Sequence, residues 1–183
     1  MQWILPGTVL RANAEDADHV ESLFQPMFLA GGMVLSQVSS ITGLEPYIIQ
    51  NWVKRGFLTP PQCKRYTLRQ LCRILNINML RGAMPLEKIC QLLSYVNGNL
   101  SDESDDMIDD SRLYFMFVQL AARMKELHDY EAGTKLLDAY LADYEEPVPG
   151  ARERVRQVLK IMLTAYLAAR LMQETEKMLS NLQ

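Results

Sequence analysis

Apolar residues recur every three or four positions along most of this 183-residue chain, and short breaks interrupt the pattern. This spacing places the apolar side chains on one face of an α-helix, and no segment shows the strict alternation expected of a long β-strand. Glycine, proline and asparagine cluster at the breaks, where a helix does not easily continue. The sequence therefore predicts an all-α fold with at most a small β wing.

The breaks divide the chain into four predicted regions. Gly31-Gly32 ends an N-terminal arm that contains a helix, and Asn97-Gly98-Asn99 ends a compact helical domain. An acidic linker follows, and a three-helix module completes the chain. The four regions are 1–32, 33–98, 99–110 and 111–183.

The second region begins with two short helices joined by a three-residue turn. Ser36 is a candidate N-cap of the first helix, which ends at Gly43. Pro46 begins the second helix, and Gly56 stops it. This spacing is typical of a helix-turn-helix. The segment 57–66 is short and contains two prolines, so we expect a loop or a small wing there.

Two longer helices complete this region. Thr67 and Gln70 form a capping-box pattern, and apolar residues recur behind them as far as Met79. Pro85 begins the last helix, whose apolar stripe runs to Val96. The region is thus predicted to be a helix-turn-helix domain of four helices.

Three helices are predicted in the C-terminal module. They run from Leu113 to Leu127, from Ala132 to Tyr144 and over 151–181. The third helix is apolar nearly all round in its middle, so it must be covered either by its own chain or by a second one. We expect this module to serve dimerisation or effector binding, with the protein a homodimer.

The net charge of −3 conceals a strong asymmetry. Region 33–98 carries 8 basic and 2 acidic residues, whereas 99–148 carries 4 basic and 13 acidic ones. Basic residues gathered in one region indicate a surface that attracts phosphate groups. We expect the acidic run at 102–110 to be a solvated linker, because it lacks the glycine and terminal glutamate of a calcium loop.

The second helix of the helix-turn-helix carries the candidate reading face. When its apolar residues pack inward, Tyr47, Gln50, Asn51 and Lys54 share the opposite face, with Arg55 beside them. Glutamine and asparagine can pair with adenine in the major groove, and lysine and arginine suit phosphates or guanine. The pattern therefore favours contact with double-stranded DNA.

Further basic residues follow this helix along the chain. Lys64 and Arg65 fall on the predicted wing, and Arg69 and Arg73 fall on the next helix. Together with the reading face they predict a continuous basic surface.

The same residues resemble a known family. The stretches Leu35-Ser-Gln-Val-Ser-Ser-Ile-Thr-Gly-Leu and Ile48-Ile-Gln-Asn-Trp-Val-Lys-Arg-Gly-Phe-Leu-Thr-Pro-Pro, followed by Lys64-Arg-Tyr, resemble the DNA-binding domain of MerR-type regulators. Residues from about 20 to 98 also resemble an uncharacterised bacterial family of unknown function. The shared pattern in that family is Asn-aromatic-Val-Lys-x-Gly-x-x-x-Pro-Pro-x-x-Lys-x-Tyr.

The resemblance implies roles for individual residues. It places Gln50, Asn51, Lys54 and Arg55 on a recognition helix, and Trp52 in the packing between helices. Gln50 stands where MerR-type proteins usually have arginine, and the wing is several residues shorter. The wing residues implied are Lys64, Arg65 and Tyr66. With Tyr47 and Arg69, these form the candidate DNA-binding set.

Other classes of function find little support in the sequence. No phosphate-binding glycine loop, nucleophile elbow or zinc motif is present, so we expect neither an enzyme nor a cofactor or metal site. Cys63, Cys72 and Cys90 have no metal-ligand spacing and fit free thiols in a reducing cytoplasm. No stretch has the length and apolar character of a membrane span, so we expect no membrane partner.

The sequence thus predicts a cytoplasmic, sequence-specific DNA-binding protein, a MerR-like transcriptional regulator whose helix 46–55 enters the major groove. One alternative is a protein–protein adaptor that uses the acidic C-terminal module, with the helix-turn-helix as scaffold. An unknown small-molecule effector could also bind among the aromatic and methionine residues of that module. The residues that suggest this are Tyr114, Phe115, Phe117, Met162 and Tyr166.

Overall fold

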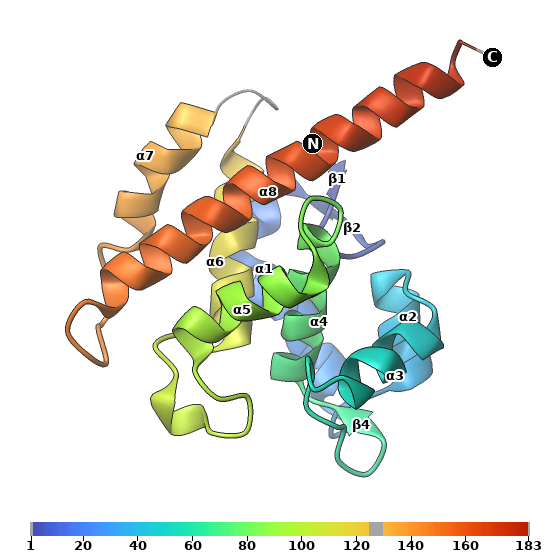
Figure 1. The fold of residues 1–183 in the computed structure, drawn as a ribbon, viewed down its shortest axis with the longest axis vertical. Helices are drawn as coiled ribbons and strands as arrows, with labels where there is room; N and C mark the ends of the chain where they lie inside the picture. Colours follow the sequence, from blue (N-terminus) through green and yellow to red (C-terminus); the bar gives the residue numbers. More distant parts are fainter. Residues whose placement is uncertain (1, 125–129, 183) are drawn as a thin grey trace.

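Helix α4 (Leu68–Leu80) runs through the centre of the molecule, and the other elements pack around it (Figure 1). The computed structural model describes residues 2–124 and 130–182. These residues form a mostly helical fold with two small antiparallel strand pairs, so the predicted fold class is confirmed. No helix in these ranges combines the length and apolar character needed to cross a membrane.

The elements follow one another along the chain in a simple order. The strands are β1 (Gln2–Ile4), β2 (Arg11–Asn13), β3 (Met33–Val34) and β4 (Arg65–Tyr66). The α-helices around α4 are α1 (Val20–Phe24), α2 (Leu35–Thr42), α3 (Pro46–Lys54), α5 (Leu86–Asn97), α6 (Asp110–Arg123), α7 (Tyr130–Tyr140) and α8 (Ala151–Ser180). Short 3-10 helices are η1 (Ala14–His19), η2 (Gln25–Phe28) and η3 (Glu103–Asp105).

Helices α2 and α3 are joined by the predicted three-residue turn. Helix α2 ends at Gly43, whose φ of 69° suits a residue without a side chain, and Pro46 occupies the first turn of α3. The predicted N-cap Ser36 is wrong by two residues, because Val34 caps α2 and donates its N–H to Gln37 Oε1 at 3.0 Å. Strand β3 precedes α2 and pairs with β4, which closes the small wing.

The start of α4 is as the capping-box pattern predicts. Gln70 N donates to Thr67 Oγ1 at 3.2 Å, and Thr67 N donates to Gln70 Oε1 at 2.9 Å. Each side chain satisfies a backbone N–H that would lack a partner at the end of a helix. Pro85 likewise directly precedes α5.

The N-terminal arm contains a β-hairpin that the sequence does not predict. Its strands β1 and β2 have three residues each, too few to show an alternating pattern. The arm is also no separate appendage, because Phe24 is fully buried and its ring lies 6.0 Å from that of Tyr114 and 5.9 Å from that of Phe115. Tyr114 further donates its hydroxyl to Pro6 O at 2.9 Å.

The C-terminal helices extend the same core. Helix α6 packs against α4, and α7 packs against α6 and α8. Helix α7 ends at Tyr140, earlier than predicted, and α6 ends at Arg123; Leu127 lies outside the described residues. Tyr114, Phe115, Phe117 and Met162, expected to line an effector site, are buried in this core. One hydrophobic cluster therefore contains residues from all four predicted regions. In the linker region, only the buried and partly buried residues belong to it.

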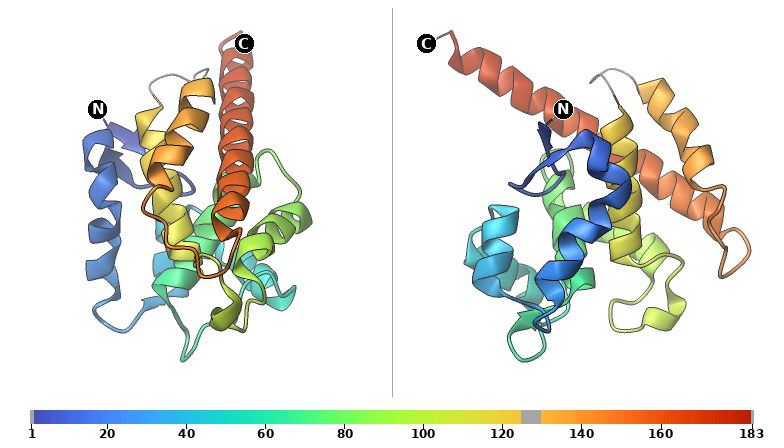
Figure 2. Two further views of the ribbon diagram at one scale, coloured as in Figure 1. Left: turned by 90° about the vertical axis from the view of Figure 1, so that its left-hand side faces the viewer. Right: turned by 180° about the vertical axis from the view of Figure 1, so that it is seen from behind.

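Helix α8 is the longest element, with 30 residues. Its first part packs on α5, α6 and α7, and its C-terminal end extends past the rest of the molecule (Figure 2). Every residue from 170 to 182 is exposed. The projecting end thus has no covering partner in the described part of this chain.

Candidate nucleic-acid interface

The outer face of α3 carries four exposed polar side chains. Ile49 and Trp52 are buried beneath the helix, and this fixes which face is turned outward. Tyr47 is 68% exposed, and Gln50, Asn51 and Lys54 are exposed beside it along the helix. No hydrogen bond or ion pair within the described residues occupies the Gln50, Asn51 or Lys54 side chain. These groups are therefore available to an external partner.

The wing presents Lys64 at the tip of a tight turn. Arg65 N donates to Gln62 O at 2.8 Å, and the two residues between them, Cys63 and Lys64, have φ values of 48° and 61°. Positive φ at both central residues is the geometry of a type I′ hairpin turn, which usually needs glycine or asparagine. This strained backbone conformation turns the Lys64 side chain outward into solvent.

A cavity of 720 Å³ separates α3 from the wing, and we call it the wing groove. Val53 and Tyr66 contribute to its apolar surface, and the polar groups at it are Ser36, Gln50, Lys54 and Lys64. None of the described residues that line it is acidic. The two lysines thus face the same groove, and no acidic residue among its described lining balances their positive charge.

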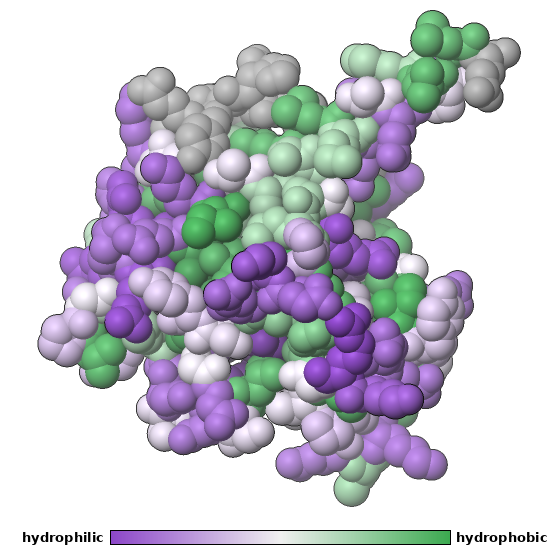
Figure 3. Space-filling view, in the orientation of Figure 1, coloured by the Kyte–Doolittle hydropathy of each residue, from purple (hydrophilic) through white to green (hydrophobic). Residues whose placement is uncertain are grey.

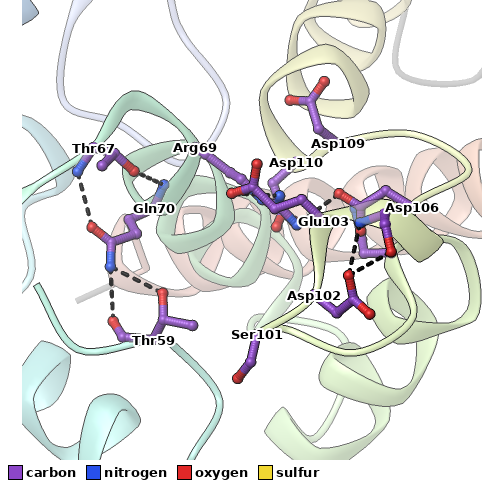
Figure 4. Close-up of polar contacts among 12 residues, drawn as sticks. Thr59, Thr67, Arg69, Gln70, Ser101, Asp102, Glu103, Asp106, Asp109 and Asp110 are labelled. Atoms are coloured by element: carbon purple, nitrogen blue, oxygen red, sulfur yellow. Dashed lines mark hydrogen bonds and ion pairs between the residues drawn. The ribbon is translucent and has the colours of Figure 1, made fainter.

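Gln70 positions the wing, a role that the sequence did not reveal. Its Nε2 donates to Thr59 O at 3.0 Å and to Thr59 Oγ1 at 2.9 Å (Figure 4). It also donates to Pro60 O at 3.1 Å. The same side chain caps α4, so one residue ties the wing to the central helix. The capping-box pattern indicated the glutamine but not the partners of its amide nitrogen.

The two exposed arginines of the candidate set already make contacts within the protein. Arg55 forms an ion pair with Glu87 and lies 4.6 Å from the centre of the Phe57 ring. Arg65 donates to Gly32 O at 2.8 Å. Both remain exposed, but their guanidinium groups already hold neighbouring segments in place.

Three residues expected at the DNA-facing surface are turned into the protein instead. Tyr66 is 3% exposed, because its position in β4 turns the ring into the core. Arg69 is half-buried and forms ion pairs with Glu103 at 3.0 Å and Asp106 at 2.7 Å. Arg73 is buried beside Asp110. The continuous basic surface predicted from 64 to 73 is therefore wrong, and Lys64 and Arg65 are its exposed remainder.

The segment 99–110, expected to be a solvated linker, folds against α4 instead, and we call it the acidic bracket. Asp102 accepts a hydrogen bond from Ser104 N at 2.9 Å, and Asp109 caps α6 by accepting from Ser111 N at 2.8 Å. Glu103 and Asp106 hold Arg69 (Figure 4). Part of the negative charge of the chain thus neutralises basic residues of α4.

Burial changes the ionisation of the bracket carboxyls. Desolvation raises the pKa of Asp106 to about 6, although the neighbouring Arg69 acts in the opposite direction. Its Oδ1 atom is buried without a hydrogen bond in the described part of the structure. Burial also raises the pKa of Asp110 despite the attraction of Arg73. For both carboxyl groups, the loss of hydration raises the pKa more than the nearby guanidinium lowers it.

This shift predicts a pH dependence of stability. The Asp106 carboxyl holds its proton up to about pH 6 in the folded protein, whereas an unfolded aspartate loses it near pH 4. The free energy of unfolding should therefore fall by about 1–3 kcal/mol as the pH rises from about 4 to 6, and then level off. Urea denaturation across this range measures it. Asp106→Asn should flatten that step, and Asp143→Asn, an exposed control, should leave it unchanged.

The comparisons with known proteins cover this interface. Residues 28–117 match the family model described as a domain of unknown function, DUF1836. The match spans just under half of the chain and includes α2, α3, the wing, α4, α5 and the acidic bracket. It agrees with the resemblance to an uncharacterised family noted in the sequence.

A relative extends the similarity beyond the family match. The uncharacterized protein YkrK of Bacillus subtilis (strain 168) is 24% identical over 160 residues, which cover 81% of this chain and 69% of that protein. No solved structure matches the chain. The family and this relative are thus described without a known activity.

Proposed function

We propose that the protein binds double-stranded DNA, with α3 in the major groove and the wing against the flanking backbone. The observation that carries the proposal is the outward face of α3, whose Gln50, Asn51 and Lys54 side chains are exposed and unpaired among the described residues. An α-helix fits the width of the major groove, and amide side chains there can distinguish adenine from other bases.

The two free lysines supply the phosphate contacts in this proposal. Lys54 lies in the last turn of α3, and Lys64 lies at the tip of the wing, on the other side of the wing groove. A phosphate chain that passes along the groove can meet both ammonium groups, and no carboxylate among the described lining residues opposes it. The strand–helix–turn–helix–wing–strand order supports a MerR-like arrangement.

A second copy of the chain is the partner that we assign to α8. Its exposed face carries residues spaced alternately by three and four positions, as in the seam of a coiled coil. These are Ile161, Thr164, Ala168, Leu171, Thr175, Met178 and Leu182, and we call them the α8 stripe. Figure 3 shows hydrophobic residues over the middle of α8 and again at its far end.

Charge favours an antiparallel pair of such helices. Lys160 and Glu174 are both exposed and lie fourteen positions, or two heptads, apart on the same flank of the α8 stripe. When two stripes run in opposite directions, Lys160 approaches the partner subunit's Glu174, and the reverse contact forms as well. A twofold dimer of this kind would present two α3 helices to two half-sites of DNA.

Leu171→Glu should therefore convert a dimer into a monomer, because each copy would place an unpaired carboxylate in the apolar seam. Light scattering after size exclusion measures the mass, which is 21.0 kDa for one chain. Ser180→Glu places the same charge on the opposite flank of α8 and should leave the dimer intact. A wild-type monomer would refute the assignment, and the adaptor function would then keep the stripe as a surface for a different protein.

Selection from random duplex DNA tests the proposed function. The wild-type protein should enrich a site with two related half-sites about one helical turn apart. Asn51→Ala should lose preference at one position in each half, which corresponds to about 1–3 kcal/mol of discrimination. Failure to enrich any sequence, or identical enrichment by both proteins, would contradict the assignment of α3 as the reading helix.

A further inference from the structure

A second cavity lies at the C-terminal end of α4, away from the acidic bracket, and the N-terminal hairpin, the end of α6 and the middle of α8 also line it. Its volume is 960 Å³, and ligand sites commonly measure about 300–1,000 Å³. None of the residues proposed to touch DNA lines it.

Part of the wall of this cavity is apolar. Met79, Ala121, Ala122 and Ala169 contribute small or apolar surfaces. The hairpin loop is fixed by close packing, since a Cβ atom at Gly7 would lie 2.4 Å from Leu75 O. The cavity thus has preformed walls that include apolar patches.

The charged groups around it are cationic. Arg81 and Arg170 both line the cavity, and the Arg170 guanidinium lies 5.7 Å from the centre of the Tyr166 ring. The indole Nε1 of Trp3 is buried and has no hydrogen-bond acceptor among the described residues. No aspartate or glutamate is found among the described residues that line the cavity.

We propose that this cavity binds a small organic anion, with an aromatic or aliphatic body against the alanines and an acid group near Arg81 and Arg170. Two guanidinium groups select a carboxylate or a phosphate monoester.

The site also lies next to the helix-turn-helix. Asn78, which lines the cavity, donates through Nδ2 to Gly7 O at 2.9 Å and to Thr42 O at 3.0 Å. Val9 N donates to Ile41 O at 2.9 Å. The hairpin loop that forms one wall of the cavity is therefore bonded directly to the end of α2. Ligand binding itself does not depend on the proposed DNA binding, and it is tested separately.

Three probes with the same ring system test the proposal by isothermal titration calorimetry. They are 2-naphthoate, 2-naphthyl phosphate and the uncharged 2-naphthalenemethanol. At least one anion should bind the full-length protein at least tenfold more tightly than the alcohol, and the tighter of the two identifies the acid group. Equal binding of all three, or no binding up to 5 mM (about the weakest affinity that would matter) would overturn the proposal.

Variants locate the bound probe. Arg170→Gln should weaken anion binding about tenfold, the loss expected for one charge-assisted contact. Arg154→Gln is the matched control, because Arg154 also lies on α8 over a tyrosine ring, Tyr95 at 5.2 Å, but outside the cavity. Ala122→Phe should block the site without removing a charge. Equal losses in Arg154→Gln and Arg170→Gln would contradict the site.

Discussion

Replacing Asp110 with alanine is expected to lower the free energy of unfolding by about 3–5 kcal/mol, because it leaves a guanidinium charge unpaired in the core. The side chains of Arg73 and Asp110 are each 2% exposed. Arg73 Nη1 lies 3.3 Å from both carboxylate oxygens, and its Nε donates to Phe57 O at 3.0 Å. This pair joins α4 to α6 and to the beginning of the wing loop.

Chemical denaturation measures this effect, and two variants serve as controls. Asp138→Ala breaks an ion pair with Arg156 of 2.7 Å at the surface, where the expected loss is about 0–1 kcal/mol. The double variant Arg73→Leu, Asp110→Leu removes both charges and should recover much of the stability lost by Asp110→Ala alone. A loss in Asp110→Ala no larger than that in Asp138→Ala would show that the buried pair does not stabilise the fold.

Removing Lys54 and Lys64 together is expected to weaken duplex binding about 100-fold at low salt, with each lost phosphate contact contributing about tenfold. These residues are the exposed lysines at the wing groove, and neither has a carboxylate partner in the described structure. In Lys54→Ala, Lys64→Ala the slope of log affinity against log salt should also become shallower by about two units.

Fluorescence anisotropy with a labelled duplex measures both quantities. Lys177→Ala, an exposed lysine on the projecting end of α8, is the charge-matched control and should bind as the wild type does. Circular dichroism confirms that the double variant is folded, which is expected because both lysines are on the surface. An unchanged salt slope in the folded double variant would exclude these lysines as phosphate contacts.

Local patterns in the sequence predicted many of the helices because each depends on neighbouring residues. Gly43 ends α2 and Pro46 begins α3, and Thr67 caps α4 together with Gln70. In each of these two motifs the residues lie within four positions of each other. The hairpin β1–β2 escaped prediction because strands of three residues carry too short a pattern. Ser36 was chosen as N-cap on residue type, whereas the Gln37 side chain determines where α2 begins.

The candidate interface was predicted in part for the same reason. The 3.6-residue period of α3 is sufficient to place Tyr47, Gln50, Asn51 and Lys54 on one exposed face. Arg69 and Arg73 could not be placed from the sequence, since their acidic partners lie more than 30 positions later in the chain. Helix α4 is covered on nearly every side, so a basic residue on it does not imply a basic surface.

Because of these contacts, the charge asymmetry of the sequence overstates the positive charge on the surface. The basic region 33–98 carries 8 basic residues, but Arg69 and Arg73 are neutralised by the acidic bracket. The exposed positive charge near α3 is correspondingly smaller, and it is concentrated around the wing groove. DNA binding through α3 and the wing therefore depends on few residues, which makes it open to a direct test.

The most direct test is a titration of the wild-type protein against a labelled random-sequence duplex of about 25 base pairs, long enough for two half-sites. We expect saturable binding with a Kd of about 1–100 µM at physiological salt, and tighter binding as the salt is lowered. An absence of binding at about 100 µM protein in low salt would contradict the assignment of α3 and the wing as a DNA-binding surface.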